Sequence, residues 1–325
     1  MSYSYAVTVP YMPKCISAAD MKEIGKLIAE RDPSLYWQPL ELKPSGGLFR
    51  LGEYRLPKVP SMMLQFHMFP AQNEIIPEFK GPRLEANPTH KAIQLKMLEK
   101  AGIKVPTWTR LERKTELDPD IFGDYVLVKP TEIGASFGRG IVMLRTSEFP
   151  AYRDEHARTY EQPGRSAPIV QKFVYTGEKP ASWRVVTFLG KVVHSRYQEI
   201  EEKTPFNAPT TRLLLQDKIA TNTEGVVRDG WLKKDEIVND IARQVSTVFP
   251  TPVLATDIIK AHDSDEYLVL EVNMGDCWMF SSRLGEKHRV RFGADAVRAQ
   301  YDVASTAADA IIEEARARLL TGAPA

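Results

Sequence analysis

Apolar residues recur with a strand period in some parts of this chain and with a helix period in others. β-Branched and aromatic residues predict strands at 5–9, 62–69, 125–129, 140–144, 168–174, 184–189, 253–259 and 267–272. An alanine-rich helix is expected from 294 to 320. Strands and helices therefore alternate along the chain, which predicts an α/β protein.

Three further helices follow from spacing and capping. Ser17 to Asp20 has the spacing of a capping box, and the helix after it carries one apolar face, made of Met21, Ile24, Leu27 and Ile28. Asn87 and Pro88 predict the start of a second helix, which ends before Gly102. A third helix carries Ile237, Ile241, Val245 and Val248 on one face.

The segments between these elements contain turn-forming and polar residues. Frequent proline and glycine predict irregular chain from Pro39 to Pro60. The long polar stretch from 193 to 230 shows little periodicity and is expected to be irregular as well. The segment from 77 to 88 is predicted to be a linker, so a domain boundary is expected near residue 86.

Composition narrows the class of protein. A length of 325 residues suggests two or three units. The 43 basic and 42 acidic residues leave a net charge of +1, so a nucleic-acid partner is not expected. The chain has no apolar run of about 18 residues and no signal-peptide pattern, so no membrane association is expected either. Cys15 and Cys277 form neither a disulfide framework nor a zinc-ligand pattern. A cytoplasmic enzyme or binding protein is the expectation.

The strongest chemical signal is a predicted β-hairpin that carries acidic residues. A turn centred on Ser264 places Asp257 opposite Glu271, with β-carbons about 5 Å apart. Asn273 projects from the same face as Glu271. Two carboxylates at that separation repel by about 3 kcal/mol at an effective dielectric of 20, so they need a cation or a shared proton. Their oxygens suit magnesium, whereas the alternative is a solvated strand face or pairing with arginine.

The other residues of this hairpin are apolar on both faces. Strict alternation assigns Tyr267 and Val269 to the face of Glu271, and Leu254 and Ile258 to the opposite face. Both faces of the hairpin are therefore expected to be buried.

A lysine and a glycine-containing loop suggest a phosphate site. Lys129 ends an apolar strand, and the loop that follows it contains Gly134, Ser136, Gly138 and Gly140. Backbone N–H groups of such a loop can surround phosphate oxygens. The segment is neither a P-loop nor a dinucleotide fingerprint, and an ordinary β-turn explains the glycines equally well.

Lys91 is placed unusually for a cation. It lies in the first turn of the predicted helix that starts at Asn87, where the helix dipole disfavours positive charge. A phosphate at this helix end would reverse the penalty. The alternative is a solvated surface lysine.

In order and spacing, these features resemble the ATP-grasp family of ligases, which includes D-alanine–D-alanine ligase and glutathione synthetase. The resemblance covers about 87–282 and rests on Lys91 with 101–106, on 128–130 with the loop to Gly140, and on Asp257 with 271–273. It implies an ATP-grasp fold with two lobes that enclose the nucleotide. The implied domains are a pre-grasp α/β domain at 1–86, a lobe with the glycine loop at 87–170, and a lobe with the metal site at 171–325.

The resemblance also implies roles for individual residues. Lys91, Lys129 and the loop residues Gly134, Ser136 and Gly138 would contact the phosphates. Asp257, Glu271 and Asn273 would hold Mg²⁺, or alternatively Mn²⁺. Lys129 and Arg184 would act in catalysis, with the arginine near the γ-phosphate.

The segment 168–174 resembles the hinge strand between the lobes. The resemblance implies that its backbone, including Lys172 and Val174, meets the adenine edge. Gln171 would stand near the adenine amino group, and Glu178 would hold the ribose hydroxyls. Two departures concern the substrate: Trp183 stands where an acidic residue often precedes the arginine, and Asn273 is not followed by Pro-Gly.

The implied function is an ATP-dependent carboxylate–amine ligase that works through an acyl phosphate and releases ADP and phosphate. Its substrates would be a small-molecule carboxylate and an amine, or a peptide, and a homo-oligomer is compatible with this reading. The alternatives are a small-molecule kinase and a non-catalytic nucleotide-binding module. Arg196, Arg212 and Arg283 are candidates for binding the carboxylate, and solvated surface arginines are the alternative for each.

Overall fold

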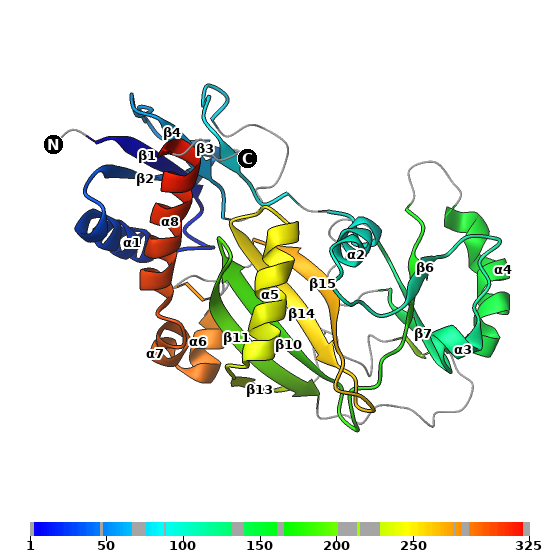
Figure 1. Ribbon diagram of the computed structural model, residues 1–325. Helices are drawn as coiled ribbons and strands as arrows, with labels where there is room; N and C mark the ends of the chain where they lie inside the picture. Colours follow the sequence, from blue (N-terminus) through cyan, green and yellow to red (C-terminus); the bar gives the residue numbers. More distant parts are fainter. Residues whose placement is uncertain are drawn as a thin grey trace.

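The computed structural model describes residues 3–45, 48–66, 76–87, 89–131, 140–160, 166–200, 213–214, 228–275, 277, 279–280 and 286–320. The strands in this part of the chain form three five-stranded sheets. Figure 1 shows the N-terminal sheet at one end of the molecule, the sheet with β10 and β14 in the middle, and the sheet with β7 at the other end. The predicted α/β class is confirmed.

The N-terminal sheet has the order β3-β2-β1-β4-β5. Its strands are β1 (Tyr5–Tyr11), β2 (Leu35–Ser45), β3 (Leu48–Leu51), β4 (Ser61–Leu64) and β5 (Arg83–Leu84). The central strand β1 is buried along its length and pairs in parallel with β2 and β4. Helix α1 (Ala18–Arg31) connects β1 to β2, and the side chain of Ser17 accepts a hydrogen bond from the backbone N–H of Asp20, as the capping box predicted.

The prediction of irregular chain from Pro39 to Pro60 is wrong for its first part. Strand β2 pairs with β1 over 35–41 and with β3 over 42–45, so each part of β2 is paired on one edge only. Pro39 and Pro44 lie in these singly paired parts, and a strand with one unpaired edge tolerates proline. The frequent prolines therefore led to a prediction of irregular chain where strand β2 is present.

The middle sheet has the order β13-β11-β10-β14-β15, and all neighbours in it are antiparallel. Its strands are β10 (Ala181–Phe188), β11 (Lys191–Ile200), β13 (Arg228–Leu232), β14 (Val253–Lys260) and β15 (Tyr267–Met274). The stretch 193–230 was predicted to be irregular, and this is wrong at both of its ends, which lie in strands β11 and β13.

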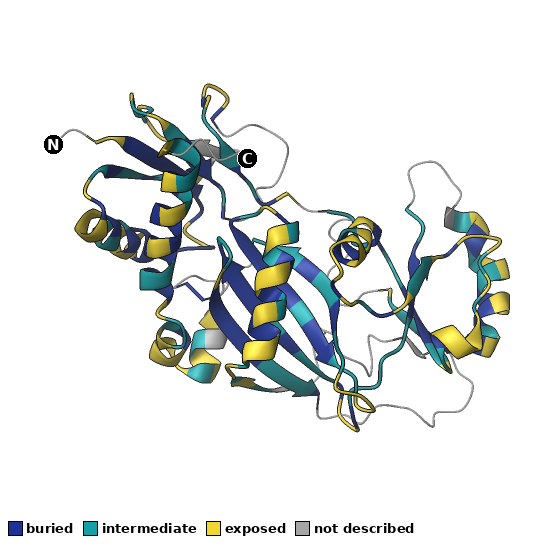
Figure 2. Cartoon of the chain, viewed as in Figure 1, coloured by how far each residue is buried: buried dark blue, intermediate teal, exposed yellow. Residues whose placement is uncertain are grey.

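Helix α5 (Glu236–Val248) covers one face of the middle sheet, whose strands are largely buried behind it (Figures 1 and 2). The buried residues of α5 include Val238, Ala242 and Val245, whereas Ile237 is 56% exposed. The predicted buried face of this helix is therefore wrong at its start, because Val238 is buried in place of Ile237. Asp235 caps the helix, and the spacing 238–242–245 faces the sheet with the small Ala242 in the middle.

The third sheet has the order β12-β8-β7-β9-β6. Its strands are β6 (Trp108–Arg110), β7 (Tyr125–Lys129), β8 (Val142–Arg145), β9 (Ile169–Lys172) and β12 (Leu213–Leu214). Helices α3 (Pro119–Phe122) and α4 (Phe149–Tyr160) accompany it, with a 3₁₀ turn at Thr146–Glu148 between β8 and α4. The boundary expected between residues 170 and 171 falls inside β9, and the division into three domains stays a prediction.

Helix α2 (Lys91–Lys100) lies between the middle and the third sheet (Figure 1). The predicted start at Asn87 is wrong, because the backbone N–H groups of Ile93 and Gln94 both donate to the carbonyl of His90. Lys91 is therefore the first helical residue. The predicted end is confirmed, since Gly102 follows the helix with a φ of +74°.

Helix α8 (Val303–Leu320) follows α6 (Glu286–Phe292) and α7 (Ala294–Ala299) and returns to the N-terminal sheet, where it lies beside α1 and β1 (Figure 1). Arg316 pairs with the buried carboxylate of Asp32 at 2.7 Å. One hydrophobic core joins α1, β1 and α8 to β10 and β14 of the middle sheet. No helix in the described ranges is long and apolar enough to cross a membrane.

Candidate active site

A row of charged residues crosses the middle sheet on the face that α5 does not cover. Arg196 on β11 is paired with Arg184 on β10, and Arg184 is paired with Asp257 on β14. Asp257 is in turn the register partner of Glu271 on β15. The predicted opposition of Asp257 and Glu271 is therefore confirmed, and two arginines extend the row across the neighbouring strands.

The hairpin contains a β-bulge that strict alternation did not anticipate. Asp257 is opposite Glu271, but the next residue, Ile258, is opposite Val269, so Leu270 is an extra residue on β15. Val269 consequently packs with Ile258 in the core beneath α5, and Tyr267 joins the same core. The prediction that Tyr267 and Val269 share the face of Glu271 is wrong. Beyond the bulge that face carries Leu268 instead.

Arg184 holds Asp257 in a two-point contact. Its Nε and Nη2 atoms donate to the two carboxylate oxygens, each at 2.5 Å. Both side chains are largely buried. Burial raises the pKa of Asp257 and outweighs the lowering by Arg184 beside it. The arginine therefore partly offsets the free-energy cost of burying this carboxylate.

Glu271 pairs with Lys91 at the start of α2, with 3.0 Å between Nζ and Oε2. Burial alone would raise the pKa of Glu271, but the charges of Lys91, Arg184 and Lys129 outweigh burial and lower the pKa to about 2. Glu271 is therefore ionised at neutral pH. The helix-terminal cation that was unusual in the sequence has an acidic partner on the edge strand β15.

Asn273 lies between the two carboxylates. Its Nδ2 atom is 3.3 Å from Oδ2 of Asp257 and 3.4 Å from Oε1 of Glu271. The three residues predicted as metal ligands therefore converge. Within the described ranges, no three side chains of His, Cys, Asp or Glu gather as a metal cluster.

Lys129 brings the third sheet to this site. Its Nζ atom donates to Oε1 of Gln171 on the neighbouring strand β9 at 2.5 Å. Burial and the nearby charge of Lys91 lower the pKa of Lys129, Glu271 and Asp257 act in the opposite direction, and the resulting pKa is about 8. These influences show that Lys129 belongs to the same cluster of charges as Lys91 and Glu271.

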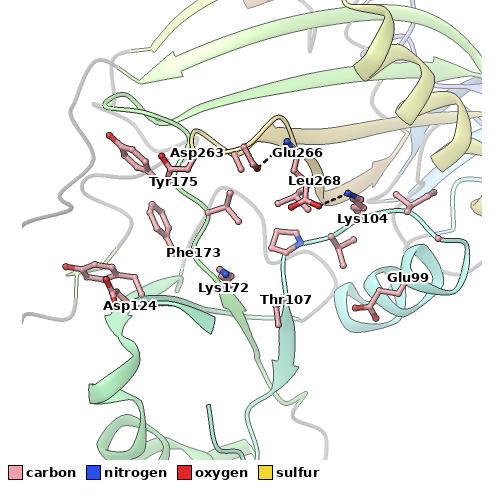
Figure 3. A pocket seen from close by; sticks show the side chains of 18 residues that line it. Glu99, Lys104, Thr107, Asp124, Lys172, Phe173, Tyr175, Asp263, Glu266 and Leu268 are labelled. Carbon is pink, nitrogen blue, oxygen red and sulfur yellow. Dashed lines mark hydrogen bonds and ion pairs between the residues drawn. The ribbon is translucent and has the colours of Figure 1, made fainter. Parts of the chain in front are cut away.

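A cavity of about 740 Å³ is lined by Lys172 of β9 and Leu268 of β15, two strands that also carry residues of this cluster, but by none of the cluster's own residues. Figure 3 shows Lys172, Phe173 and Tyr175 along one side and Leu268 on another, with the salt bridge between Lys104 and Glu266 at 2.7 Å. Its full lining comprises Glu99, Gly102, Ile103, Lys104, Val105, Pro106, Thr107, Asp124, Tyr125, Lys172, Phe173, Val174, Tyr175, Ala261, Asp263, Ser264, Glu266 and Leu268. The cavity thus opens where the chain passes between the third and the middle sheet.

No protein-family model and no curated protein matches the sequence. Among solved structures, D-cycloserine synthetase DcsG matches 95% of this chain and 99% of its own, with a TM-score of 0.51 and 14% identity. The ATP-grasp ligase PsnB, complexed with a phosphomimetic variant of minimal precursor, Mg and ADP, is a second match. The match covers 97% of this chain and 99% of the PsnB chain, with a TM-score of 0.50 and 14% identity. The macrocyclase MdnC, bound with precursor peptide MdnA from Microcystis aeruginosa MRC, is a third match. The match covers 95% of this chain and 99% of the MdnC chain, with a TM-score of 0.50 and 11% identity.

The chain has the ATP-grasp fold. The matches span nearly the whole chain, so the ATP-grasp architecture extends beyond the 87–282 that the sequence resemblance covered. The fold predicted from that resemblance is confirmed.

Several predicted site residues of the ATP-grasp chain lie outside the described residues. They are Gly134, Ser136 and Gly138 of the glycine loop, and the two arginines Arg212 and Arg283. Lys172 and Val174 line the cavity, whereas Gln171 and Glu178 are not among its lining residues. Glu178 belongs to the connection between β9 and β10.

Sequence reasoning missed part of the cavity. Strict alternation from Glu271 places Leu268 on the opposite face of the hairpin, and the bulge at Leu270 shifts it to the face of Glu271. The Lys104–Glu266 pair joins residues far apart in the sequence, and neither residue stands out among the charged residues of the chain. The signal that could have found Leu268 is the apolar run 267–270, in which alternation is absent.

Proposed function

We propose that this chain is an ATP-dependent carboxylate–amine ligase that forms an amide or peptide-like bond and releases ADP and phosphate. The observation that carries the proposal is the convergence of Lys91, Lys129 and Arg184 with the carboxylates of Asp257 and Glu271. These residues come from different elements, α2, β7, β10, β14 and β15, which a merely structural ion pair does not require.

The cavity is the proposed site of the adenine base. Its volume of about 740 Å³ lies within the usual range of small-molecule pockets, roughly 300–1,000 Å³. Apolar walls from Phe173 and Leu268 suit a planar ring. The phosphates would then extend toward Lys129 and Lys91.

The donor set of Asp257, Glu271 and Asn273 fits Mg²⁺. Magnesium commonly takes one or two carboxylates from the protein and fills its other positions with water and phosphate oxygens. The two carboxylates agree with that pattern, and the amide of Asn273, whose Nδ2 faces both carboxylates, would have to turn its oxygen toward the ion. Mn²⁺ accepts the same hard oxygen ligands. When bound, the metal ion would neutralise charge on the β- and γ-phosphates.

The proposed chemistry needs positioning and charge neutralisation from the protein rather than a covalent intermediate with it. The γ-phosphoryl group moves to an oxygen of the substrate carboxylate and leaves ADP. The amine then attacks the acyl carbon, and phosphate departs with the carboxylate oxygen that it received. Lys129, largely protonated at pH 7, would hold the phosphate chain, and Arg184 would stabilise the charge of the group in transfer.

Arg196 is the proposed carboxylate-binding residue. It is 8% exposed and is the register partner of Arg184, so both arginines stand on the same face of the middle sheet. A guanidinium group binds a carboxylate through two parallel hydrogen bonds. This placement favours a carboxylate held beside the γ-phosphate over the solvated surface arginine that the sequence left as an alternative.

The matched structures support the choice of substrate class. DcsG is a D-cycloserine synthetase, and PsnB and MdnC are bound with precursors in those structures. We therefore propose a small-molecule carboxylate and an amine, or a peptide that supplies one of them. A kinase with an alcohol as acceptor remains the second candidate, because the same phosphate and metal residues would serve it.

The test is an ADP-release screen against pairs of amino acids and peptides. Once a pair is found, a carboxylate labelled with heavy oxygen should pass one label into the released phosphate, and hydroxylamine should trap a hydroxamate. A phosphorylated alcohol without label transfer would identify the kinase. Release of AMP and pyrophosphate would contradict phosphoryl transfer, and nucleotide binding without turnover on any pair would favour the non-catalytic module.

A further inference from the structure

A second cavity, of about 390 Å³, lies at the turn of the β14–β15 hairpin. Its lining includes the turn residues 261–265 together with Ala181, Trp183, Tyr197 and Lys260. Its volume lies within the usual range of small-molecule pockets, roughly 300–1,000 Å³. None of the described residues assigned above to nucleotide, metal or substrate lines it.

This cavity lies on the face of the middle sheet that α5 covers. Trp183 packs in the core beneath α5, whereas the next residue on β10, Arg184, points to the opposite face and holds Asp257. Tyr197 is the register partner of Trp183, and the centroids of the two rings are 4.6 Å apart. The sheet therefore separates a ligand in this cavity from the proposed site of reaction.

Trp183 carries a hydrogen-bond donor that the fold does not use. Its side chain lines the cavity and the residue is 7% exposed. The Nε1 atom has no hydrogen-bond partner within the described part of the chain. The indole N–H is a donor only, and a buried donor without a partner is unfavourable. A ligand that brings an acceptor to this wall of the cavity would therefore be stabilised.

Charged groups of both signs line the same cavity. Lys260 pairs with Asp265 at 2.7 Å, and the side chain of Asp265 is 97% exposed. Because such an exposed pair contributes little to stability, either group can turn to a ligand at a small cost. Asp263 adds a second carboxylate to the lining. The cavity therefore suits a ligand that carries an anionic acceptor and a cation together.

We propose that this cavity binds a free aromatic α-amino acid. The carboxylate of the ligand accepts a hydrogen bond from Nε1 of Trp183 and pairs with Lys260. Its ammonium group pairs with Asp263, and its aromatic side chain packs against the ring of Tyr197. The inference is independent of the proposed ligation, because it uses none of the residues assigned to that reaction.

The experiment is calorimetry on the full chain with L-phenylalanine, with phenethylamine, which lacks the carboxylate, and with 3-phenylpropionate, which lacks the amine. Wild-type protein should bind L-phenylalanine about tenfold more tightly than phenethylamine, as expected for one hydrogen bond to a charged group. It should also bind L-phenylalanine more tightly than 3-phenylpropionate. In Trp183→Phe, which keeps a ring and removes the N–H, most of the tenfold difference should disappear.

Two further variants locate the bound amino acid. Lys260→Met keeps the length of the side chain and removes its charge, so it should weaken binding of L-phenylalanine roughly threefold, the loss of one exposed charge pair. Arg196→Ala lies on the opposite face of the sheet and should leave this binding unchanged. Melting temperatures check that each variant is folded.

The outcomes separate this inference from the proposed function. If L-phenylalanine does not bind wild-type protein, or if folded Trp183→Phe keeps the preference for the carboxylate, the inference is overturned. If Arg196→Ala weakens binding and Trp183→Phe does not, the amino acid occupies the proposed substrate site, and only the second site is overturned. Loss of ATP binding in wild-type protein would contradict the proposed function alone. Should Trp183→Phe fail to fold, an unchanged affinity in Lys260→Met overturns the inference.

Discussion

Arg184 and Asp257 face each other on neighbouring strands and share two hydrogen bonds of 2.5 Å. Lys91 makes a similar pair with Glu271 one strand further along. The carboxylates proposed to bind the metal are thus already neutralised by the cations proposed to bind the phosphates. On the proposed function, Lys91 and Arg184 would turn from these carboxylates to the phosphates when nucleotide binds, and the carboxylates would then be free to hold Mg²⁺.

This arrangement predicts that Mg²⁺ binds weakly without nucleotide. Calorimetric titration of Mg²⁺ should give an affinity at least tenfold higher in the presence of a non-hydrolysable ATP analogue than in its absence, because one lost charge pair corresponds to about that factor. Titration of the analogue with Mg²⁺ in buffer alone is the control. Equally tight binding of Mg²⁺ to the nucleotide-free protein would contradict the exchange.

Glu271→Gln tests the metal site. The variant keeps the shape of the side chain and removes one charge, so the fold should persist while Mg²⁺-dependent turnover falls by about a hundredfold or more. Turnover is measured at limiting Mg²⁺, and circular dichroism checks the fold. Glu30→Gln removes a carboxylate from an exposed pair with Lys26 and should leave turnover unchanged. A wild-type turnover rate in Glu271→Gln would contradict the metal site and leave the hairpin with a structural role only.

Lys129→Ala tests the phosphate site. Loss of a desolvated charge opposite phosphate should cost about 2 kcal/mol or more, so the Kd for ATP should rise at least tenfold. Lys96→Ala, on the exposed side of α2, is the matched control. An ATP affinity that is the same in both variants would contradict the assignment of Lys129 to the phosphate site.

The lowered pKa of Lys129, about 8, predicts a pH dependence of nucleotide binding. Below pH 8 the lysine is mostly charged and pairs with phosphate. As the pH rises through 8, the free protein loses this proton, and the Kd for ATP should increase by up to tenfold per pH unit. Lys129→Arg, whose guanidinium stays charged throughout this range, should show a flat profile from pH 7 to 9.5. A wild-type profile as flat as that of the arginine variant would contradict the assignment.

Arg196→Ala should separate carboxylate binding from nucleotide binding. If Arg196 holds the carboxylate, the KM for that substrate should rise by roughly tenfold or more while the Kd for ATP stays within twofold, because one charge-assisted contact is lost. Arg196→Lys keeps the charge without the two-point geometry and should recover only part of the loss. A parallel weakening of ATP binding would instead place Arg196 at the γ-phosphate.

The hairpin shows how much of the site was accessible from sequence. The opposition of Asp257 and Glu271 was predicted from a turn centred on Ser264, and it is observed. Next to the turn, however, Lys260 faces Tyr267, which is one step away from that register, and the extra residue Leu270 restores the predicted opposition. The pairing of Arg184 with Asp257 does not follow, because β10 and β14 are neighbours in the sheet but are separated by β11 and β13 in the chain. Only the resemblance to ATP-grasp ligases brought Arg184 to this site.

Local patterns failed where tertiary contacts decide the outcome. Pro39 and Pro44 indicate irregular chain only if the neighbours of β2 are unknown. Ile237 is more apolar than Ala242, yet Ala242 is buried because it lies where α5 packs against the sheet. The bulge at Leu270 redirects the side chains of a whole strand segment without any glycine or proline to mark it.

The position of α8 gives the protein an order of assembly during synthesis. Strand β1 and helix α1 leave the ribosome well before α8, which shares a core with them through Ala307, Ala308 and Ile311. The apolar side of α1, with Ile24 and Ile28, has no cover from α8 until then. The core over the first sheet is thus completed late, and a nascent chain that stalls before α8 presents an open hydrophobic surface to chaperones and proteases.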